Sequence, residues 1–128
     1  MLLLLDTHVL LWSVFEYHRL SAAARQALAN TENILYFSAV SAWEVATKVQ
    51  TGKLVLFGSV HEFIEAQCLH LGLTKLPLTV DHATTVSVLP PIHRDPADRL
   101  LIAQAMVEGL TLVTADAFIR QSDVPTLW

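Results

Sequence analysis

The chain has 128 residues, of which 53% are hydrophobic and 16% charged, and its formal net charge is −4. This length fits one domain, residues 1–128. The acidic balance does not supply the basic face with which a conventional nucleic-acid binder neutralises phosphates, and it argues against tight, sequence-specific binding to DNA. Cys68 is the only cysteine, so no internal disulfide can form, and the leucine run after Met1 is too short for a signal peptide or membrane span; we therefore expect a cytoplasmic protein.

The first half of the chain alternates short apolar runs with helical patterns. Residues 2–6 are four leucines followed by Asp6, and such a run is typical of a strand buried on both faces. A second strand is predicted at 34–37, and it ends at Ser38. Helical or apolar patterns cover 9–15, 20–28 (with Ser21 as its N-cap) and 41–48.

The second half repeats this alternation. Helical patterns are predicted at Val60–Leu71, from a cap at Thr79 or Asp81 through Val88, and at 100–107. Asp95, followed by Pro96, caps the last of these helices. Strands are predicted at 73–78, at 110–113 and, at the sheet edge, at 125–128. Strands that alternate with helices predict an α/β fold, a three-layer α/β/α sandwich with a central, mainly parallel sheet.

Two aspartates, Asp6 and Asp116, each follow a leucine-rich strand. If those strands are parallel neighbours, both carboxylates emerge at the same edge of the sheet, where α/β proteins bind ligands. Asp116 is equally well explained as the N-cap of a helical turn at Ala117–Arg120, and Asp6 as a cap of the turn that follows it. An ionised carboxylate at the tip of a buried strand is costly unless water, a cation or donors meet it, which favours a functional role for Asp6.

Two further aspartates, Asp95 and Asp98, lie in the first turn of a predicted helix. Negative charge there complements the helix dipole, so a cap and a helix-start carboxylate are their structural explanation. Asp98 is in line with Leu101, Ile102 and Ala105, which must pack on the sheet, and we expect it to point to the sheet edge. Asp98 is the better site candidate and Asp95 the better cap.

Glu44 leaves three interpretations open. It completes a capping box with Ser41, or it forms an i,i+4 surface pair with Lys48. If Ser38 caps the helix instead, Glu44 lies a full turn inside it, between residues that face the core. In that position it becomes a candidate for the functional site.

Carboxylates gathered in one cleft repel one another, and their neutral forms are favoured unless a cation is present. Hard oxygen ligands suit Mg²⁺ or Mn²⁺, often together with waters and substrate phosphates. This donor set supports metal-assisted phosphodiester hydrolysis by an enzyme that needs no basic face. The six histidines show no paired metal spacing, which makes zinc a poor fit.

Four blocks of sequence occur in order between Leu2 and Asp116: LLLLDTH, SAVSAWEVATK, HRDPADRLLIAQA and LVTAD. Together they resemble the signature of PIN-domain ribonucleases, and in particular the VapC-type toxins of bacterial toxin–antitoxin pairs. The resemblance spans essentially the whole chain. It implies the parallel α/β/α sandwich and a cleavage of RNA that depends on Mg²⁺ or Mn²⁺.

The resemblance also assigns roles to individual residues. The family's four acids fall on Asp6, Glu44, Asp98 and Asp116, which would be both catalytic residues and metal ligands. Neighbouring residues would support the cluster or contact substrate: Ser38, Asp95, Arg99 and Thr114. As partners it implies an RNA substrate, a cognate antitoxin whose tail covers the active site, and a second copy of the chain in a homodimer, with no membrane involved.

Further polar residues near these blocks are candidates for substrate contacts. The basic ones, which would hold flanking phosphates, are Lys48, Lys53, Arg94 and Arg99. His8 and His93 lie near the same blocks, although a local hydrogen bond explains either of them equally simply.

Two alternative functions are compatible with parts of this pattern. An apolar strand that ends in Asp also begins the haloacid-dehalogenase-type phosphatases, but their second Asp, two residues later, is replaced by His8 here. A non-catalytic PIN-like module that only binds RNA or a protein would have the same fold, and the presence of all four acids argues against it.

Overall fold

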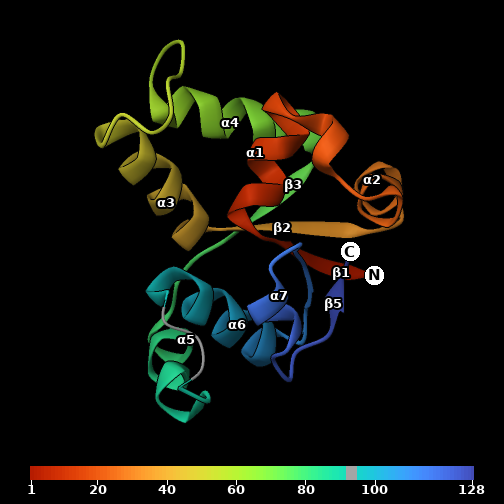
Figure 1. The fold of residues 1–128 in the computed structure, drawn as a ribbon, viewed down its shortest axis with the longest axis vertical. Coiled ribbons are helices and arrows are strands. Elements are labelled where there is room, and N and C mark those ends of the chain that lie inside the picture. Colours follow the sequence, from red (N-terminus) through yellow and green to blue (C-terminus); the bar gives the residue numbers. More distant parts are fainter. Residues whose placement is uncertain (92–94) are drawn as a thin grey trace.

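The computed structural model describes residues 1–91 and 95–128. Its centre is a five-stranded sheet in which every neighbouring pair is parallel, in the order β3-β2-β1-β4-β5 (Figure 1). The strands are β1 (Leu2–Leu5), β2 (Ile34–Ser38), β3 (Leu73–Leu76), β4 (Thr111–Val113) and β5 (Thr126–Leu127). The predicted α/β sandwich is confirmed, with a sheet that is entirely parallel among the described strands.

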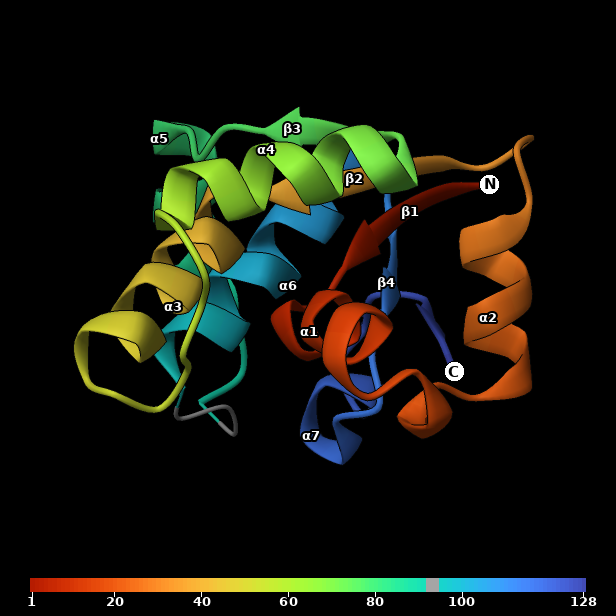
Figure 2. The same ribbon diagram turned by 90° about the horizontal axis from the view of Figure 1, so that it is seen from above.

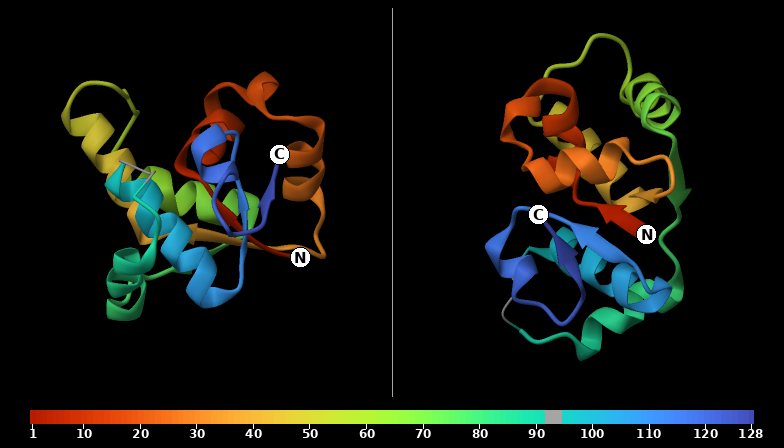
Figure 3. Two further views of the ribbon diagram at one scale, coloured as in Figure 1. Left: turned by 60° about the horizontal axis from the view of Figure 1, so that its bottom comes forward. Right: turned by 90° about the vertical axis from the view of Figure 1, so that its right-hand side faces the viewer.

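Helices cover both faces of this sheet. The helices are α1 (Thr7–Phe15), α2 (Ala22–Ala29), α3 (Ala39–Gln50), α4 (Val60–Leu71), α5 (Val80–Thr85), α6 (Pro96–Glu108) and α7 (Ala117–Arg120), with 3-10 turns η1 (Tyr17–Arg19) and η2 (Val86–Val88). Figures 2 and 3 show α1, α2 and α4 on one face and α5, α6 and α7 on the other. None of the helices that the structure describes combines the length and the apolar character needed to cross a membrane.

The leucine run of β1 lies in the middle of the sheet and joins the cores of both faces. Leu3, Leu4 and Leu5 are each fully buried. Leu3 and Leu5 pack with residues of α1 and α2, whereas Leu4 packs with residues of α6. Alternate side chains of a strand point to opposite faces, so the sequence LLLL fills two hydrophobic cores at once.

Two helices begin earlier in the chain than the apolar patterns predicted. Helix α1 begins at Thr7, directly after Asp6, and α3 begins at Ala39 instead of residue 41. Ser38 is the last residue of β2 and also the N-cap of α3, because its Oγ accepts a hydrogen bond of 3.0 Å from the backbone N–H of Val40. The strand therefore passes into the helix without a loop, and Glu44 lies a full turn inside α3.

The predicted caps of the second half are mostly confirmed. Of the two alternatives for α5, Thr79 is the cap, since its Oγ1 accepts from the N–H of His82 at 3.2 Å. This helix ends at Thr85 and continues only as the 3-10 turn η2. Asp95 caps α6 and Asp116 caps α7, each through a side-chain oxygen.

Candidate active site

Asp6 and Asp116 emerge side by side at the carboxyl edge of the sheet. Strands β1 and β4 are parallel neighbours with Leu5 opposite Val113, and the Asp6 N–H donates to the Val113 carbonyl at 3.0 Å. Thr114 joins the two acids: its Oγ1 donates to Asp6 Oδ2 at 2.8 Å and accepts from the Asp116 N–H at 3.0 Å. This is the edge at which open α/β sheets bind ligands.

Glu44 is attached to the same edge through Thr7. The Thr7 hydroxyl lies 2.5 Å from Glu44 Oε1 and 2.8 Å from Ser41 Oγ. A hydroxyl has one hydrogen, so Thr7 donates to the carboxylate and accepts from Ser41. Because Thr7 directly follows Asp6, this bond draws α3 onto the end of β1. Ser41 thus binds Thr7 and does not cap the helix.

Asp95 has the capping role that the helix pattern predicted, and Asp98 does not cap the helix. Asp95 is exposed, and its Oδ1 accepts from the Ala97 N–H at 2.9 Å as the N-cap of α6. Asp98, one turn further, is half-buried and accepts no recorded hydrogen bond from the part of the chain that the structure describes. Its pKa nevertheless responds to each of the other acids, which places it within their electrostatic reach.

Burial and mutual repulsion raise the pKa values of three of these carboxyl groups. Burial raises the pKa of Asp98 to about 7, with further upward contributions from the charges of Asp95, Asp6, Asp116 and Glu44. Burial likewise raises the pKa of Asp6, against the opposing effect of the Thr114 hydrogen bond, and the pKa of Glu44, against that of Thr7. The cluster is thus short of positive charge at neutral pH.

The donor set fits a hard divalent cation. The ion pairs recorded for residues 1–91 and 95–128 are Arg19–Glu16, Lys75–Glu65 and His82–Glu108, so none neutralises the cluster. Within the same ranges, no three acidic, histidine or cysteine side chains converge into a ready-made ligand shell. Mg²⁺ often takes only one or two carboxylates and completes its octahedron with water and phosphate oxygens, so this spread cluster suits it.

The hydrogen bonds also leave oxygens available for a cation. Glu44 uses Oε1 for Thr7, and Asp116 uses Oδ1 as the cap of α7, at 2.8 Å from the Phe118 N–H. Over the described chain, the second oxygen of each of these two carboxylates accepts no recorded hydrogen bond. Each acid is therefore held in place through one oxygen while the other can bind a ligand.

The remaining residues assigned by resemblance lie in different places. Thr114 is within the cluster, as described above. Ser38 is fully buried and donates to Gln104 Oε1 at 2.5 Å, toward α6. The guanidinium of Arg99 donates to the Val86 carbonyl at 3.3 Å, toward η2 and not toward the carboxylates. Candidates His93 and Arg94 lie outside the described residues.

Sequence reasoning missed the positioning roles of Thr7 and Gln104. For Thr7 the sequence gives one weak indication of this role, because a hydroxyl next to an aspartate at a strand end can donate a hydrogen bond. For Gln104 it gives none, since a glutamine on the apolar side of a helix does not indicate its hydrogen-bond partners.

Two cavities border the acidic cluster. One, of about 210 Å³, is lined by Asp6, His8, Trp12, Ala115 and Asp116. The other, of about 230 Å³, is lined by Trp43, Glu44, Thr47, Lys48, Thr51, Lys53, Asp95 and Ala97. Lys48 and Lys53, two of the candidates for holding flanking phosphates, thus line the same cavity as Glu44.

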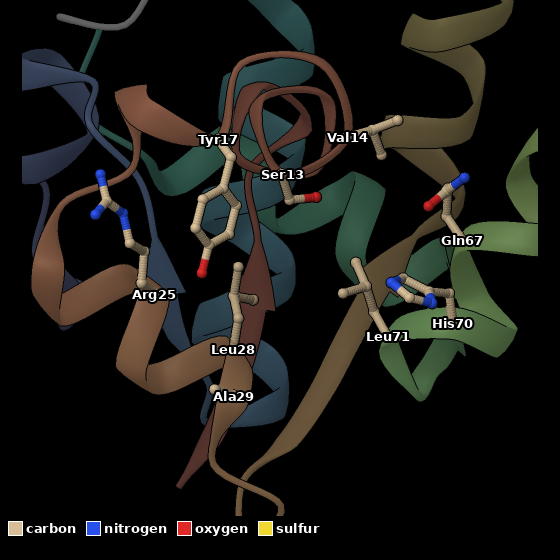
Figure 4. A pocket seen from close by; sticks show the side chains of 9 residues that line it. All are labelled: Ser13, Val14, Tyr17, Arg25, Leu28, Ala29, Gln67, His70 and Leu71. Atoms are coloured by element: carbon tan, nitrogen blue, oxygen red, sulfur yellow. The ribbon is translucent and has the colours of Figure 1, made fainter.

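A larger groove lies away from the cluster, between α1, α2 and α4. It measures about 360 Å³, and Figure 4 shows the side chains that line it, among them Tyr17, Arg25 and His70. None of the four candidate acids contributes to its wall. Its size alone does not make it the chemical site, because the perturbed carboxyl groups are elsewhere.

Comparison with known proteins identifies the family of the chain. The PIN domain family model matches residues 3–124, which is nearly the whole chain. The chain belongs to the PIN-domain family. Ribonuclease VapC22 of Mycobacterium tuberculosis (strain ATCC 25618 / H37Rv) is 34% identical to this PIN domain, over 98% of this chain and 97% of the relative. The resemblance to VapC-type PIN-domain ribonucleases is thereby confirmed.

Solved structures share the fold. VapBC2 from Rickettsia felis, bound to a DNA fragment from their promoter, matches 98% of this PIN domain and 97% of its own chain, with a TM-score of 0.72 and 14% identity. FitAB bound to an IR36 DNA fragment matches 97% of this chain and 92% of its own, with a TM-score of 0.66 and 25% identity. The family differs from that of the haloacid-dehalogenase-type phosphatases, and this alternative is set aside.

Proposed function

We propose that this PIN domain is a Mg²⁺- or Mn²⁺-dependent ribonuclease that hydrolyses RNA phosphodiester bonds. The observation that carries the proposal is the acidic cluster: Asp6, Glu44, Asp98 and Asp116 come from four separate segments and share one sheet edge. Burial and repulsion raise pKa values there, and no recorded ion pair relieves them in the described chain.

Each side chain has a part in the proposed reaction. Asp6, Asp98 and Asp116 would hold the principal cation, while Glu44 would support a second ion or orient the attacking water. When bound, such a cation lowers the pKa of the attacking water and stabilises the charge on the departing 3′-oxygen. Thr114 and Thr7 keep Asp6 and Glu44 in position.

The cavity beside Glu44 would accommodate the RNA backbone. Lys48 and Lys53 line it together with Asp95, and their ammonium groups are suited to phosphates that flank the cleaved bond. The protein therefore needs no extended basic face, which agrees with its net charge of −4.

The proposal extends to biological role and partners. A relative named Ribonuclease VapC22 and solved neighbours that are VapBC2 and FitAB assemblies support a toxin of a toxin–antitoxin pair, with a cognate antitoxin as partner. The resemblance to VapC-type toxins supports a homodimer in the same way.

RNA cleavage by the purified protein is the direct test. We expect single-stranded RNA to be cut in Mn²⁺ or Mg²⁺, and not in EDTA, and Asp6→Asn to be inactive although it is isosteric. Asp81→Asn is the matched control, because Asp81 is an exposed acid on α5 outside the cluster. Cleavage that persists in EDTA, or in Asp6→Asn, contradicts the metal mechanism; a folded protein that never cleaves RNA supports the non-catalytic binding module instead.

Growth of a bacterial host separates the toxin from a housekeeping nuclease. Expression of the wild type should slow growth, and Asp98→Asn should not. Co-expression of the gene for a cognate antitoxin should restore growth. If the protein cleaves RNA but its expression does not slow growth, the nuclease function is supported and the toxin role is contradicted.

A further inference from the structure

We propose that the cavity between α1 and the segment after β4 is a nucleobase subsite, in which a base next to the cleaved phosphate stacks on the rings of His8 and Trp12. The inference rests on the proposed ribonuclease function and extends it by assigning a specificity site. It concerns the cavity of about 210 Å³ lined by Asp6, His8, Trp12, Ala115 and Asp116.

The position of this cavity relates it to the scissile bond. Asp6 and Asp116 form part of its wall and are also candidate cation ligands. A phosphate held at those carboxylates through a cation would therefore lie at the mouth of the cavity. The nearest group of RNA that can enter is the nucleoside on one side of that phosphate.

Two aromatic rings supply a surface for a flat ligand. His8 and Trp12 are one helical turn apart on α1, with ring centroids 5.8 Å apart and planes inclined by 49°. His8 is exposed and Trp12 is half-buried, so the first ring is accessible while the second is anchored. Base–aromatic stacking is the usual way in which proteins hold unpaired bases.

Contacts with neighbouring residues hold the indole of Trp12 in place. The guanidinium carbon of Arg19 lies 4.4 Å from the ring centroid of Trp12. The ring centroid of Trp128 lies 5.9 Å from that of Trp12, and the two ring planes are inclined by 59°. An aromatic wall fixed in this way loses little conformational entropy when a ligand binds. The indole is thus prepared for binding before any RNA arrives.

The chemistry of the wall favours a base over a phosphate. Among residues 1–91 and 95–128, neither lysine nor arginine lines this cavity and two carboxylates do, so those carboxylates would repel a phosphate that has no cation. The cavity beside Glu44 has the opposite character, with Lys48 and Lys53 in its wall. The two cavities therefore suit different parts of RNA, a base in one and backbone phosphates in the other.

The test combines ring removal from the protein with base removal from the RNA. His8→Ala should weaken binding of a short RNA by about 5- to 30-fold, seen as a rise in KM with kcat nearly unchanged. His8→Phe, which restores a ring without charge or ring nitrogens, should recover most of this loss. His61→Ala is the matched control, because His61 is an exposed histidine on α4 outside both cavities.

Abasic oligonucleotides identify the bound base. One should lack the base on the 5′ side of the cleaved bond and another the base on the 3′ side. For one of these oligonucleotides, the loss of affinity caused by the abasic change and His8→Ala in combination should be no larger than the loss caused by either change alone. Independent, additive effects on both sides would overturn the proposal, as would a His8→Phe variant no better than His8→Ala.

Equilibrium binding keeps this result separate from the nuclease question. The same comparisons, made by fluorescence polarisation with labelled oligonucleotides in a Glu44→Gln background, do not require turnover, and Glu44 does not line this cavity. Dependence of binding on His8 without cleavage by the wild type would contradict only the proposed reaction. Cleavage with His8-independent binding would contradict only the subsite. Trp12→Leu serves as a second variant, read in the same assay after its folding has been checked.

Discussion

Thr114 Oγ1 donates a hydrogen bond of 2.8 Å to Asp6 Oδ2, although the two residues are 108 positions apart in the chain. The same oxygen accepts from the Asp116 N–H at 3.0 Å. One buried hydroxyl thus fixes the carboxylate of one candidate ligand and the backbone of another. The pairing of β1 with β4 makes this contact possible, because Leu5 lies opposite Val113.

Replacement of Thr114 should therefore affect both stability and catalysis. Thr114→Val removes the donor to buried Asp6, and we expect the free energy of unfolding to fall by about 1–3 kcal/mol. Loss of a partner that orients a metal ligand should lower ribonuclease activity by about 10- to 100-fold. Urea denaturation and kcat/KM for RNA measure the two effects. Thr114→Ser keeps the hydroxyl and is the control. Equal stability and equal kcat/KM of the Thr114→Val and Thr114→Ser variants would contradict the proposed role of this hydrogen bond.

The raised pKa of Asp98 predicts an unusual effect of Asp98→Asn on stability. Without metal, the folded protein prefers the protonated carboxyl, with a pKa of about 7 against the ordinary 3.8. The stability due to this preference is complete below pH 3.8 and is lost as the pH rises through about 7. Asp98→Asn avoids the loss, so its melting temperature in EDTA should exceed that of the wild type increasingly between pH 4.5 and pH 8.

Thermal melts in EDTA at several pH values check this expectation. Asp81→Asn, at an exposed position on α5, should show no such gain. A stability difference between Asp98→Asn and the wild type that is independent of pH, or that shrinks as the pH rises, would contradict it. Ribonuclease activity should be lost in Asp98→Asn at every pH.

Metal binding should depend on pH in the same range. A cation that binds Asp98 must displace its proton below pH 7. If one proton is displaced, the affinity for the cation should fall by about tenfold for each unit by which the pH is lowered below 7. Calorimetric titration of Mn²⁺ between pH 5.5 and pH 8, without RNA, measures this dependence. The dependence should be weaker in Asp98→Asn. An affinity for Mn²⁺ that does not change with pH would exclude Asp98 from the site.

Much of the arrangement of the candidate site could be predicted from sequence, because it depends on where strands and helices end. A carboxylate after a buried strand, such as Asp6 or Asp116, is placed by the topology of the sheet alone. The first turn of α6 similarly fixes Asp95 as the cap and turns Asp98 inward. These placements follow from backbone geometry, which local patterns encode.

The parts that could not be predicted depend on which way a side chain turns. Arg99 is adjacent to Asp98 in sequence, yet its guanidinium reaches the Val86 carbonyl of η2. The Glu44 carboxylate is fixed by Thr7, 37 positions away, and no local spacing contains that contact. Short-range patterns carry no information on such long-range side-chain partners, and only the assembled fold supplies them.

Ser38 provides a last prediction, because the resemblance and the geometry give it different roles. The resemblance places it near the cations, whereas in the structure its hydroxyl caps α3 and donates to fully buried Gln104. If it acts through Gln104, Ser38→Ala and Gln104→Leu should each lower the free energy of unfolding, by about 1–3 kcal/mol for every buried partner left unsatisfied. Both variants should keep near-wild-type kcat/KM when assayed well below their melting temperatures. If Ser38→Ala loses activity while fully folded and Gln104→Leu does not, Ser38 acts directly at the metal site instead.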